Sequence, residues 1–407
     1  MDFKDTAQEH AFRMQARCWL ETNAPGKGSA GDFSDAYQSS AFDEAQYVRR
    51  CKDWQATLSA GGWAGITWPK EYGGCGGTSL EASIFAEEQS RSGVSSGIFA
   101  IGIGMAGPTI AAHGTDAQKE RYLPRLLRGE EVWCQLFSEP SAGSDLASLS
   151  TRAEVDGDEW VVNGQKVWTS GAHYSDFGIL LTRTDLDVPK HRGITYFLVD
   201  MRTPGIDIRP LRQMTGTSHF SEVFLTDVRI PKENILGEVN EGWGVAMTTL
   251  TNERMLIGEG ASKLEYSDVR ALVGDRIADP ILRQRLADAF IRFEILRYLS
   301  MRVRTAASQG KMPGPEVSVM KLFYAGHLKK TSDLALALQG PAGMLAGADA
   351  PAAGAWQQQF LNAPAMRIAG GSDEIQRKII GERVLGLPSE PRVDKDVPFR
   401  DQIHRRP

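Results

Sequence analysis

The spacing of apolar residues changes twice along this 407-residue chain. From residue 6 to about 131, and again from about residue 243 onwards, apolar residues recur every three or four positions, which is typical of amphipathic helices. Between these parts the period shortens and β-rich runs alternate with turns, which is typical of strands. The sequence therefore predicts a mainly α protein with a central β-domain, in the order α, β, α.

This pattern divides the chain into three predicted domains. We expect an N-terminal helical domain over residues 1–131, a middle antiparallel β-barrel or sandwich over 132–232, and a C-terminal four-helix bundle within 233–407. The bundle helices are predicted over residues 245–269, 280–307, 315–339 and 373–384. The strands are predicted over residues 132–137, 150–155, 159–163, 165–169, 178–184, 193–200, 206–210 and 222–230.

Capping and turn residues place the ends of several elements. Thr115 and Asp116 predict an N-cap that opens a helix ending near Leu127. Asp156-Gly157 and Asn163-Gly164 each lie between alternating apolar runs, which predicts two tight hairpins. The chain should therefore form a compact set of short strands after its first helices.

Composition narrows the classes of function. A formal net charge of -5 gives no basic surface for nucleic acid. The seven histidines lack paired spacing and the four cysteines form no CxxC, so we expect no metal site. The apolar run 97–110 is too short and too glycine-rich to span a bilayer, which predicts a buried helix and no integral membrane segment. No secretory signal is visible at the N-terminus, so we expect a cytoplasmic protein.

Two motifs in the middle segment combine hydrogen-bond donors with aromatic side chains. The first is W-C-Q-L-F-S-E-P-S-A-G-S-D, from Trp133 to Asp145, and the second is N-G-Q-K-V-W-T-S, from Asn163 to Ser170. A redox flavin needs donors along the polar edge of its ring and an apolar wall against its face. Each motif alone is also compatible with an ordinary strand end or a core aromatic. Together, in this order, they favour a flavin site.

The element order and these motifs resemble the acyl-CoA dehydrogenase family of flavoenzymes over nearly the whole chain. The resemblance is weakest over residues 26–43 and 261–281. It implies FAD as the cofactor and assigns roles by position. The residues that would contact the isoalloxazine are Phe137 and Ser138, those beside the pyrophosphate or substrate are Gly143 and Ser144, and those covering the flavin are Trp168 and Ser170.

The resemblance also implies a catalytic base. The family removes an α-proton with a carboxylate while the β-hydrogen leaves as hydride. Most members carry that carboxylate on a loop before the last helix, at the position of Gly370, which has no side chain to do it. Glu253 stands where a minority of members, including isovaleryl- and long-chain-type enzymes, carry the base on a helix. We therefore expect Glu253 as the base, with Arg254 orienting this region and the N–H of Gly370 donating to the thioester oxygen.

These assignments have plainer alternatives. Glu253 could be a surface glutamate paired with a cation, and Arg254 could belong to a surface salt bridge. For the cofactor pyrophosphate the family pattern R-x-x-F-G is missing, and only Arg270 or Arg276 could replace its arginine. The segment Q-G-P-A-G replaces a glycine-rich motif, and its proline removes one backbone donor. The remaining cofactor-binding residues implied by the resemblance are Gly340, Ser372 and Glu374.

The resemblance implies dehydrogenation of an acyl-CoA to the trans-2-enoyl-CoA in fatty-acid or lipid degradation. Electrons would pass to electron-transfer flavoprotein, and the protein would be a homodimer or homotetramer. Two alternatives stay open. One is a structural or flavin-poor subunit of a hetero-oligomeric acyl-CoA dehydrogenase, and the other is a flavin oxidase or monooxygenase of the same fold. Linear, branched and steroid side-chain thioesters are all compatible with the sequence.

Overall fold

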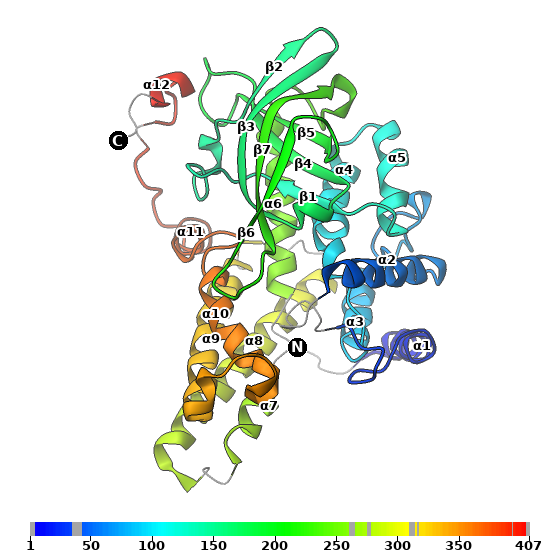
Figure 1. Ribbon diagram of the computed structural model, residues 1–407, viewed down its shortest axis with the longest axis vertical. Helices are drawn as coiled ribbons and strands as arrows, with labels where there is room; N and C mark the ends of the chain where they lie inside the picture. The colour runs from blue at the N-terminus through cyan, green and yellow to red at the C-terminus, as the bar shows by residue number, and fades with distance from the viewer. Residues whose placement is uncertain are drawn as a thin grey trace. The chain divides into compact units, whose positions relative to one another are not determined.

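The computed structural model describes residues 5–34, 43–259, 265–274, 278–308, 314–315, 317–392 and 394–403. Helices precede and follow a central β-sheet, which confirms the predicted fold class (Figure 1). The chain forms two compact units, each built from three segments. One unit comprises Met1–Arg50, Gly76–Ser95 and Arg254–Pro388, and the other comprises Cys51–Cys75, Ser96–Glu253 and Ser389–Pro407.

A single seven-stranded sheet lies in the second unit (Figure 1). The strands are β1 (Trp133–Leu136), β2 (Arg152–Asp156), β3 (Glu159–Ser170), β4 (Phe177–Arg183), β5 (Ile194–Asp200), β6 (Ile206–Leu211) and β7 (Phe220–Pro231). They follow the order β1-β4-β2-β3-β7-β6, with β5 on the other side of β4. Buried apolar residues from most of these strands, including Leu136, Val162, Leu180, Phe197 and Val223, form its core.

The prediction of an antiparallel domain is wrong for β1. This strand pairs with β4 in parallel, with Trp133 opposite Phe177, and β2 meets β4 in parallel at Arg152 and Arg183. A parallel pair needs a crossover connection, which the β2–β3 hairpin supplies here. Turn signals report only on neighbouring segments, so they could not show the pairing of strands so far apart in the chain.

One of the two predicted hairpins is confirmed and the other is wrong. Asp156 pairs with Glu159, so the β2–β3 turn is as expected. Asn163-Gly164 instead lies inside β3, at a bulge opposite Asp227 of β7. The Asn163 side chain donates to the Asp227 carboxylate and accepts its N–H, which stabilises the left-handed φ of 50° at Asp227. Glycine is required at 164 because a Cβ there would meet Thr151 Oγ1 at 2.5 Å.

Helical segments complete the second unit. The predicted N-cap is confirmed, because α5 (Asp116–Leu127) opens with a capping box between Thr115 and Gln118. The glycine-rich run 97–110 forms a short 3₁₀ turn, a π-helical turn and α4 (Gly107–His113), and is largely buried, as expected. No helix within the described ranges is long and apolar enough to cross a membrane.

The first unit is helical. Its helices are α1 (Ala7–Asn23), α3 (Ser79–Gln89), α7 (Tyr266–Ala271), α8 (Pro280–Ser308), α9 (Val317–Gln339), α10 (Ala355–Met366) and α11 (Asp373–Ile379). Leu286 of α8, Leu334 of α9 and Trp356 of α10 share one buried cluster. Two helices, α2 (Glu44–Ala60) and α6 (Gly242–Glu259), belong partly to each unit, and α12 (Phe399–Ile403) ends the described chain.

The predicted bundle helices need two corrections. The helix expected over 245–269 is not continuous, because Glu265 has extended backbone and caps the separate helix α7. The chain between α6 and α7, residues 260–264, lies outside the described residues. Helix α10 was not predicted, because it follows an alanine- and glycine-rich stretch with weak apolar periodicity. The last predicted helix is present as α11 followed by the π-helical turn Ile380–Val384.

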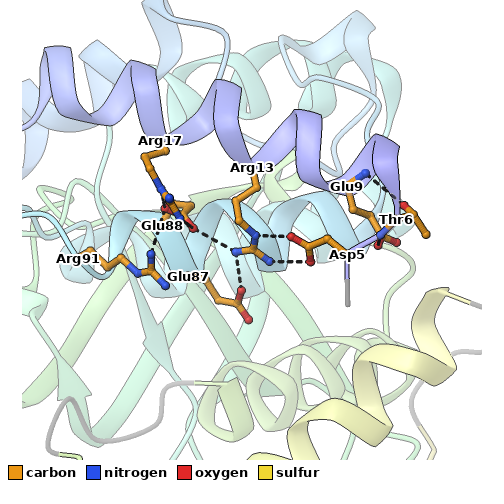
Figure 2. Close-up of polar contacts among 8 residues, drawn as sticks. All are labelled: Asp5, Thr6, Glu9, Arg13, Arg17, Glu87, Glu88 and Arg91. Carbon is orange, nitrogen blue, oxygen red and sulfur yellow. Dashed lines mark hydrogen bonds and ion pairs between the residues drawn. The ribbon is translucent and has the colours of Figure 1, made fainter. Parts of the chain in front are cut away.

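Ion pairs join α1 to α3 in the first unit. Figure 2 shows Arg13 and Arg17 of α1 converging on Glu88 of α3, with donor–acceptor distances of 2.8–3.1 Å. The Glu88 side chain is only 1% exposed. Arg13 also contacts Asp5 and Glu87, so one guanidinium connects three carboxylates. These contacts attach the N-terminal helix through charge as well as apolar packing.

Candidate active site

The two sequence motifs lie together in the second unit. The first motif continues β1 as Phe137-Ser138-Glu139, and the second forms the end of β3. The Val167 N–H donates to the Ser138 carbonyl at 2.9 Å, and Lys166 Nζ donates to the Phe137 carbonyl at 3.1 Å. Phe137 is buried with its ring edge-on to Tyr196 of β5. The structure thus brings these predicted cofactor residues into one region.

A buried ion pair connects the motifs. Lys166 Nζ lies 2.8 Å from Glu139 Oε1, and neither side chain is more than 3% exposed. The Glu139 carboxylate also accepts hydrogen bonds from the backbone of Ser150 and Thr151. Burial alone would raise the pKa of Glu139, but Lys166 and these donors hold the pKa at about 2. Sequence reasoning gave this pair no role, although both residues stand inside the quoted motifs.

Trp168 projects from the sheet at a strained position. Its φ is 62°, a left-handed conformation that is unusual for a bulky residue, and its side chain is 61% exposed. A register irregularity between Lys166 and Thr169 accompanies it, and its ring packs edge-to-face with that of Phe220. Ser170 follows, half-buried at the strand end. The exposed indole and the nearby strand-end hydroxyl offer an aromatic surface and a hydrogen-bonding group to a ligand.

The segment after Glu139 is open to solvent. Glu139 and Ala142 form a tight bridge, after which Gly143 and Ser144 are exposed. No described atom lies within 4 Å of where a Gly143 Cβ would stand. Gly143 and Ser144 therefore border open space, as a contact with an extended ligand requires.

Glu253 lies on α6 and is half-buried. Gln135 of β1 donates its amide to Glu253 Oε2 at 3.4 Å. One turn earlier, the buried Thr249 shares hydrogen bonds of 3.0 Å with Tyr196 of β5 and Thr109 of α4. These contacts attach α6 to the sheet and place the carboxylate next to β1. The Arg254 side chain lies outside the described residues.

Gly370 belongs to a loop in the first unit, ahead of α11. Its φ is 64°, and its carbonyl accepts a hydrogen bond of 2.9 Å from the Gln376 side chain. Ser372 is the N-cap of α11 and accepts the Ile375 N–H, so its hydroxyl stabilises the helix start. Glu374 is exposed and pairs with Arg377. A hydrogen bond to its backbone N–H, together with smaller effects, lowers the pKa of Glu374.

The two residues expected at the cofactor pyrophosphate are both exposed in the first unit. Arg270 lies in the last turn of α7 and has no ion-pair partner among the described residues. Gly340 follows α9 with a φ of 58° and opens a 3₁₀ turn that contains Pro341. The alternative arginine, Arg276, lies outside the described residues.

The second unit offers residues that fit the ring of FAD. The Ser138 and Ser170 side chains are half-buried and Trp168 is exposed, so this region offers hydroxyl groups and an aromatic surface to a polar-edged ring. In the first unit, Arg270 carries a positive charge, and Pro341 lacks a backbone N–H. Within the described ranges, no cluster of three or more His, Cys, Asp or Glu side chains could hold a metal ion.

Three further residues were missed by sequence reasoning. Gln135 contacts the proposed base, and its only sequence signal is its place two residues before Phe137. Lys321 and Gln376 contact the glycine loop from α9 and α11. No local pattern marks Lys321, because a lysine in a helix is ordinarily exposed.

Comparison with known proteins identifies the family to which this architecture belongs. Three family models match in succession: "Acyl-CoA dehydrogenase, N-terminal domain" over residues 7–130, the middle domain over 134–228 and the C-terminal domain over 240–385. The chain belongs to the acyl-CoA dehydrogenase family.

Individual relatives agree with this assignment. Acyl-CoA dehydrogenase IpdE1 of Mycobacterium tuberculosis (strain ATCC 25618 / H37Rv) is 40% identical over 386 residues, which is 93% of this chain and 98% of that protein. A solved structure described as "Tcur3481-Tcur3483 steroid ACAD" has a TM-score of 0.82 at 28% identity, covering 96% of this chain and 100% of that chain. The ChsE4-ChsE5 complex from Mycobacterium tuberculosis has a TM-score of 0.79 at 30% identity, with coverage of 96% and 100%.

Proposed function

We propose that this chain catalyses FAD-dependent α,β-dehydrogenation of an acyl-CoA thioester to the trans-2-enoyl-CoA, with Glu253 as the base. The observation that carries the proposal is the contact between Glu253 and Gln135. Through this contact a carboxylate lies beside β1, and the strand continues directly into Phe137 and Ser138. The more usual position for the base in this family is occupied by Gly370, which has no carboxylate.

In the proposed mechanism, bound FAD supplies the acceptor for the β-hydrogen. The Glu253 carboxylate takes the α-proton, and the Gln135 amide orients that carboxylate by donating to Oε2. The N–H of Gly370 donates to the thioester oxygen as negative charge develops there. Phe137 and Trp168 form apolar walls that exclude water, and Arg254 orients the segment around the base. Gly143 and Ser144 contact the extended ligand.

The partners in this proposal follow from family membership. Electrons leave through an electron-transfer flavoprotein, and the chain assembles as a homodimer or homotetramer. Steroid side-chain thioesters come first among substrates to test, since a solved relative is described as a steroid ACAD. Branched and linear acyl-CoAs complete the panel.

Replacing the proposed base tests the mechanism. Glu253→Gln should retain bound flavin and substrate affinity but lose roughly 100- to 10,000-fold in the rate of substrate-dependent flavin bleaching, because an amide cannot accept a proton. The measurement is anaerobic mixing with the acyl-CoA panel, followed by absorbance. Glu241→Gln is the matched control, since Glu241 lies just before α6, is exposed and has no ion pair among the described residues. A fully active Glu253→Gln would show that the base lies elsewhere.

A second candidate function is a flavin-poor subunit of a mixed-chain dehydrogenase. It is favoured by Pro341 at the proposed pyrophosphate position and by similarity to a complex of two different chains, ChsE4 and ChsE5. The chain purified alone discriminates the candidates. A yellow protein with flavin bands supports the dehydrogenase, whereas a colourless protein that gains flavin only with a second chain supports the subunit. Slow reaction of the substrate-bleached protein with air disfavours an oxidase.

A further inference from the structure

The Gly370–Gly371 loop is held by its carbonyl groups. The Gln376 side chain donates to the Gly370 carbonyl at 2.9 Å and to the Gly371 carbonyl at 3.2 Å. Lys321 Nζ donates to the Gly371 carbonyl at 2.6 Å. Lys321 comes from α9 and Gln376 from α11, so two helices hold the loop from the carbonyl side.

Both side chains that hold the loop are buried. Lys321 is 1% exposed and Gln376 is 0% exposed. An ammonium removed from water is costly unless hydrogen bonds satisfy it, so a lysine at this position needs a structural or functional reason. Its short, charge-assisted bond to a loop carbonyl is stronger than a neutral contact. The Gly371 carbonyl therefore has little freedom to rotate.

Fixing these carbonyls also fixes the opposite side of the loop. In a trans peptide the C=O and the following N–H point in opposite directions, so the held carbonyls set the direction of the N–H groups of Gly371 and Ser372. The N–H groups of residues 370–372 donate to no acceptor within the described chain. The structure thus presents three consecutive donors, and two of them, the N–H groups of Gly371 and Ser372, are oriented by carbonyls that Gln376 and Lys321 hold.

The loop depends on two glycines for its backbone conformation. Gly370 and Gly371 have φ values of 64° and 92°, which only glycine adopts without strain. A Cβ on Gly371 would stand 2.6 Å from Gln376 Nε2. The carbonyl contacts are therefore what select one arrangement of a segment that is intrinsically permissive.

We propose that Lys321 is a positioning residue that, with Gln376, holds the Gly370–Gly371 backbone so that its N–H groups stabilise the enolate formed from the acyl thioester. This inference rests on the proposed function and extends it to residues that do not touch the substrate. Lys321 acts through the loop and transfers no proton to or from the substrate. Its loss should slow α-proton removal while leaving cofactor content and substrate affinity nearly unchanged.

The test measures α-proton removal separately from turnover. The probe is an acyl-CoA analogue with sulfur in place of the β-carbon, which cannot lose a β-hydride, and the measurement is exchange of its α-hydrogens into heavy water by mass spectrometry. Lys321→Met should slow exchange roughly 10- to 100-fold, less than the roughly 100- to 1,000-fold typical of deleting an oxyanion donor. Lys321→Gln, which keeps a donor without the charge, should fall between this variant and the wild type.

The control is Lys329→Met on the same helix, where the lysine is 48% exposed and pairs with Asp333. It should exchange at the wild-type rate. If a folded Lys321→Met exchanged at the wild-type rate, the proposal would be overturned, because the lysine would then not affect proton removal. Unfolding of both Lys321 variants would also overturn it, because the lysine would then serve stability alone. Failure of the proposed function is distinct, because the wild-type protein itself would then exchange no α-hydrogen.

Discussion

At the residue scale, Glu139 and Lys166 have a role that differs from those of their neighbours in the same motifs. Phe137, Ser138 and Trp168 belong to the candidate site, whereas the Glu139–Lys166 pair is almost wholly removed from water. The pair holds β1 and β3 together through side-chain and backbone contacts. Removing one partner of such a pair leaves an uncompensated buried charge, which typically costs roughly 3–5 kcal/mol.

The pair predicts a specific dependence of stability on pH. The pKa of Glu139 is about 2 in the folded protein, against an ordinary value of 4.5. A depressed folded pKa stabilises the fold above the unfolded pKa, and this contribution is lost as pH falls from about 5 towards 2. It amounts to about 3 kcal/mol at neutral pH, by the conversion of about 1.4 kcal/mol per unit.

Chemical denaturation checks this prediction. Glu139→Gln should reduce the free energy of unfolding at about pH 7, and the difference from wild type should shrink as the pH falls through this window. The control is Glu154→Gln on neighbouring β2, because Glu154 is 67% exposed and forms only a surface pair with Arg152. If Glu139→Gln had the same free energy of unfolding as the wild type at neutral pH, the stabilising role of the Glu139–Lys166 pair would be contradicted.

At the element scale, α1 depends on a carboxylate of α3. Arg13 and Arg17 both donate to Glu88, and the hydrogen bond from Arg17 is the main reason that the pKa of Glu88 is lowered (Figure 2). Arg17 remains partly exposed, so solvent screens part of the attraction. Because the Glu88 side chain is almost fully buried, removing its charge is still costly. The guanidinium groups of Arg13 and Arg17 would lose their shared acceptor.

A pair of neighbouring substitutions tests this attachment. Glu88→Gln should destabilise the docking of α1 by about 2 kcal/mol, as expected for charged hydrogen bonds, and should speed hydrogen exchange in α1. Glu87→Gln removes one contact from a side chain that is 37% exposed and should cost less than about 1 kcal/mol. If the amides of α1 were equally protected from hydrogen exchange in both variants, Glu88 would contribute no more than Glu87 to the attachment of α1.

At the scale of the whole molecule, the C-terminal segment returns to the central sheet. Phe399 is buried, and the guanidinium of Arg183 on β4 lies 4.0 Å from its ring centroid. Arg183 in turn donates to the carbonyls of Ala147 and Lys190. Lys190 also pairs with Asp145 and with Asp394 of the C-terminal segment. The match to the C-terminal domain model ends at residue 385, so Asp394 and Phe399 lie outside the part of the chain that the family models match.

The segment should therefore contribute to the stability of the second unit. Phe399→Ala should lower the free energy of unfolding by roughly 3–5 kcal/mol, because it leaves a cavity and removes the partner of a buried guanidinium. Arg400→Ala is the neighbouring control, since Arg400 is 55% exposed and forms a surface pair with Asp187. For both variants, unfolding curves measure the free energy of unfolding, and limited proteolysis reports whether the C-terminal segment stays attached. A cost below about 1 kcal/mol for Phe399→Ala would mean that the segment is dispensable.

The sequence by itself determined those features whose physical cause is local. The α, β, α order follows from apolar spacing, the start of α5 from the Thr115 cap, and the β2–β3 turn from Asp156-Gly157. The motifs around Phe137 and Trp168 were visible for the same reason, since each is contiguous. The base and loop residues, Glu253 and Gly370, could be proposed only by resemblance to a family.

The tertiary structure decided what depends on residues distant in the chain. Asn163-Gly164 has the composition of a turn, but pairing with β7 makes it a bulge inside a strand. The parallel pairing of β1 with β4 and the contacts made by Lys321 have no local signature either. Their cause is packing between separate elements, whose free energy outweighs local preference and cannot be seen in any single stretch of sequence.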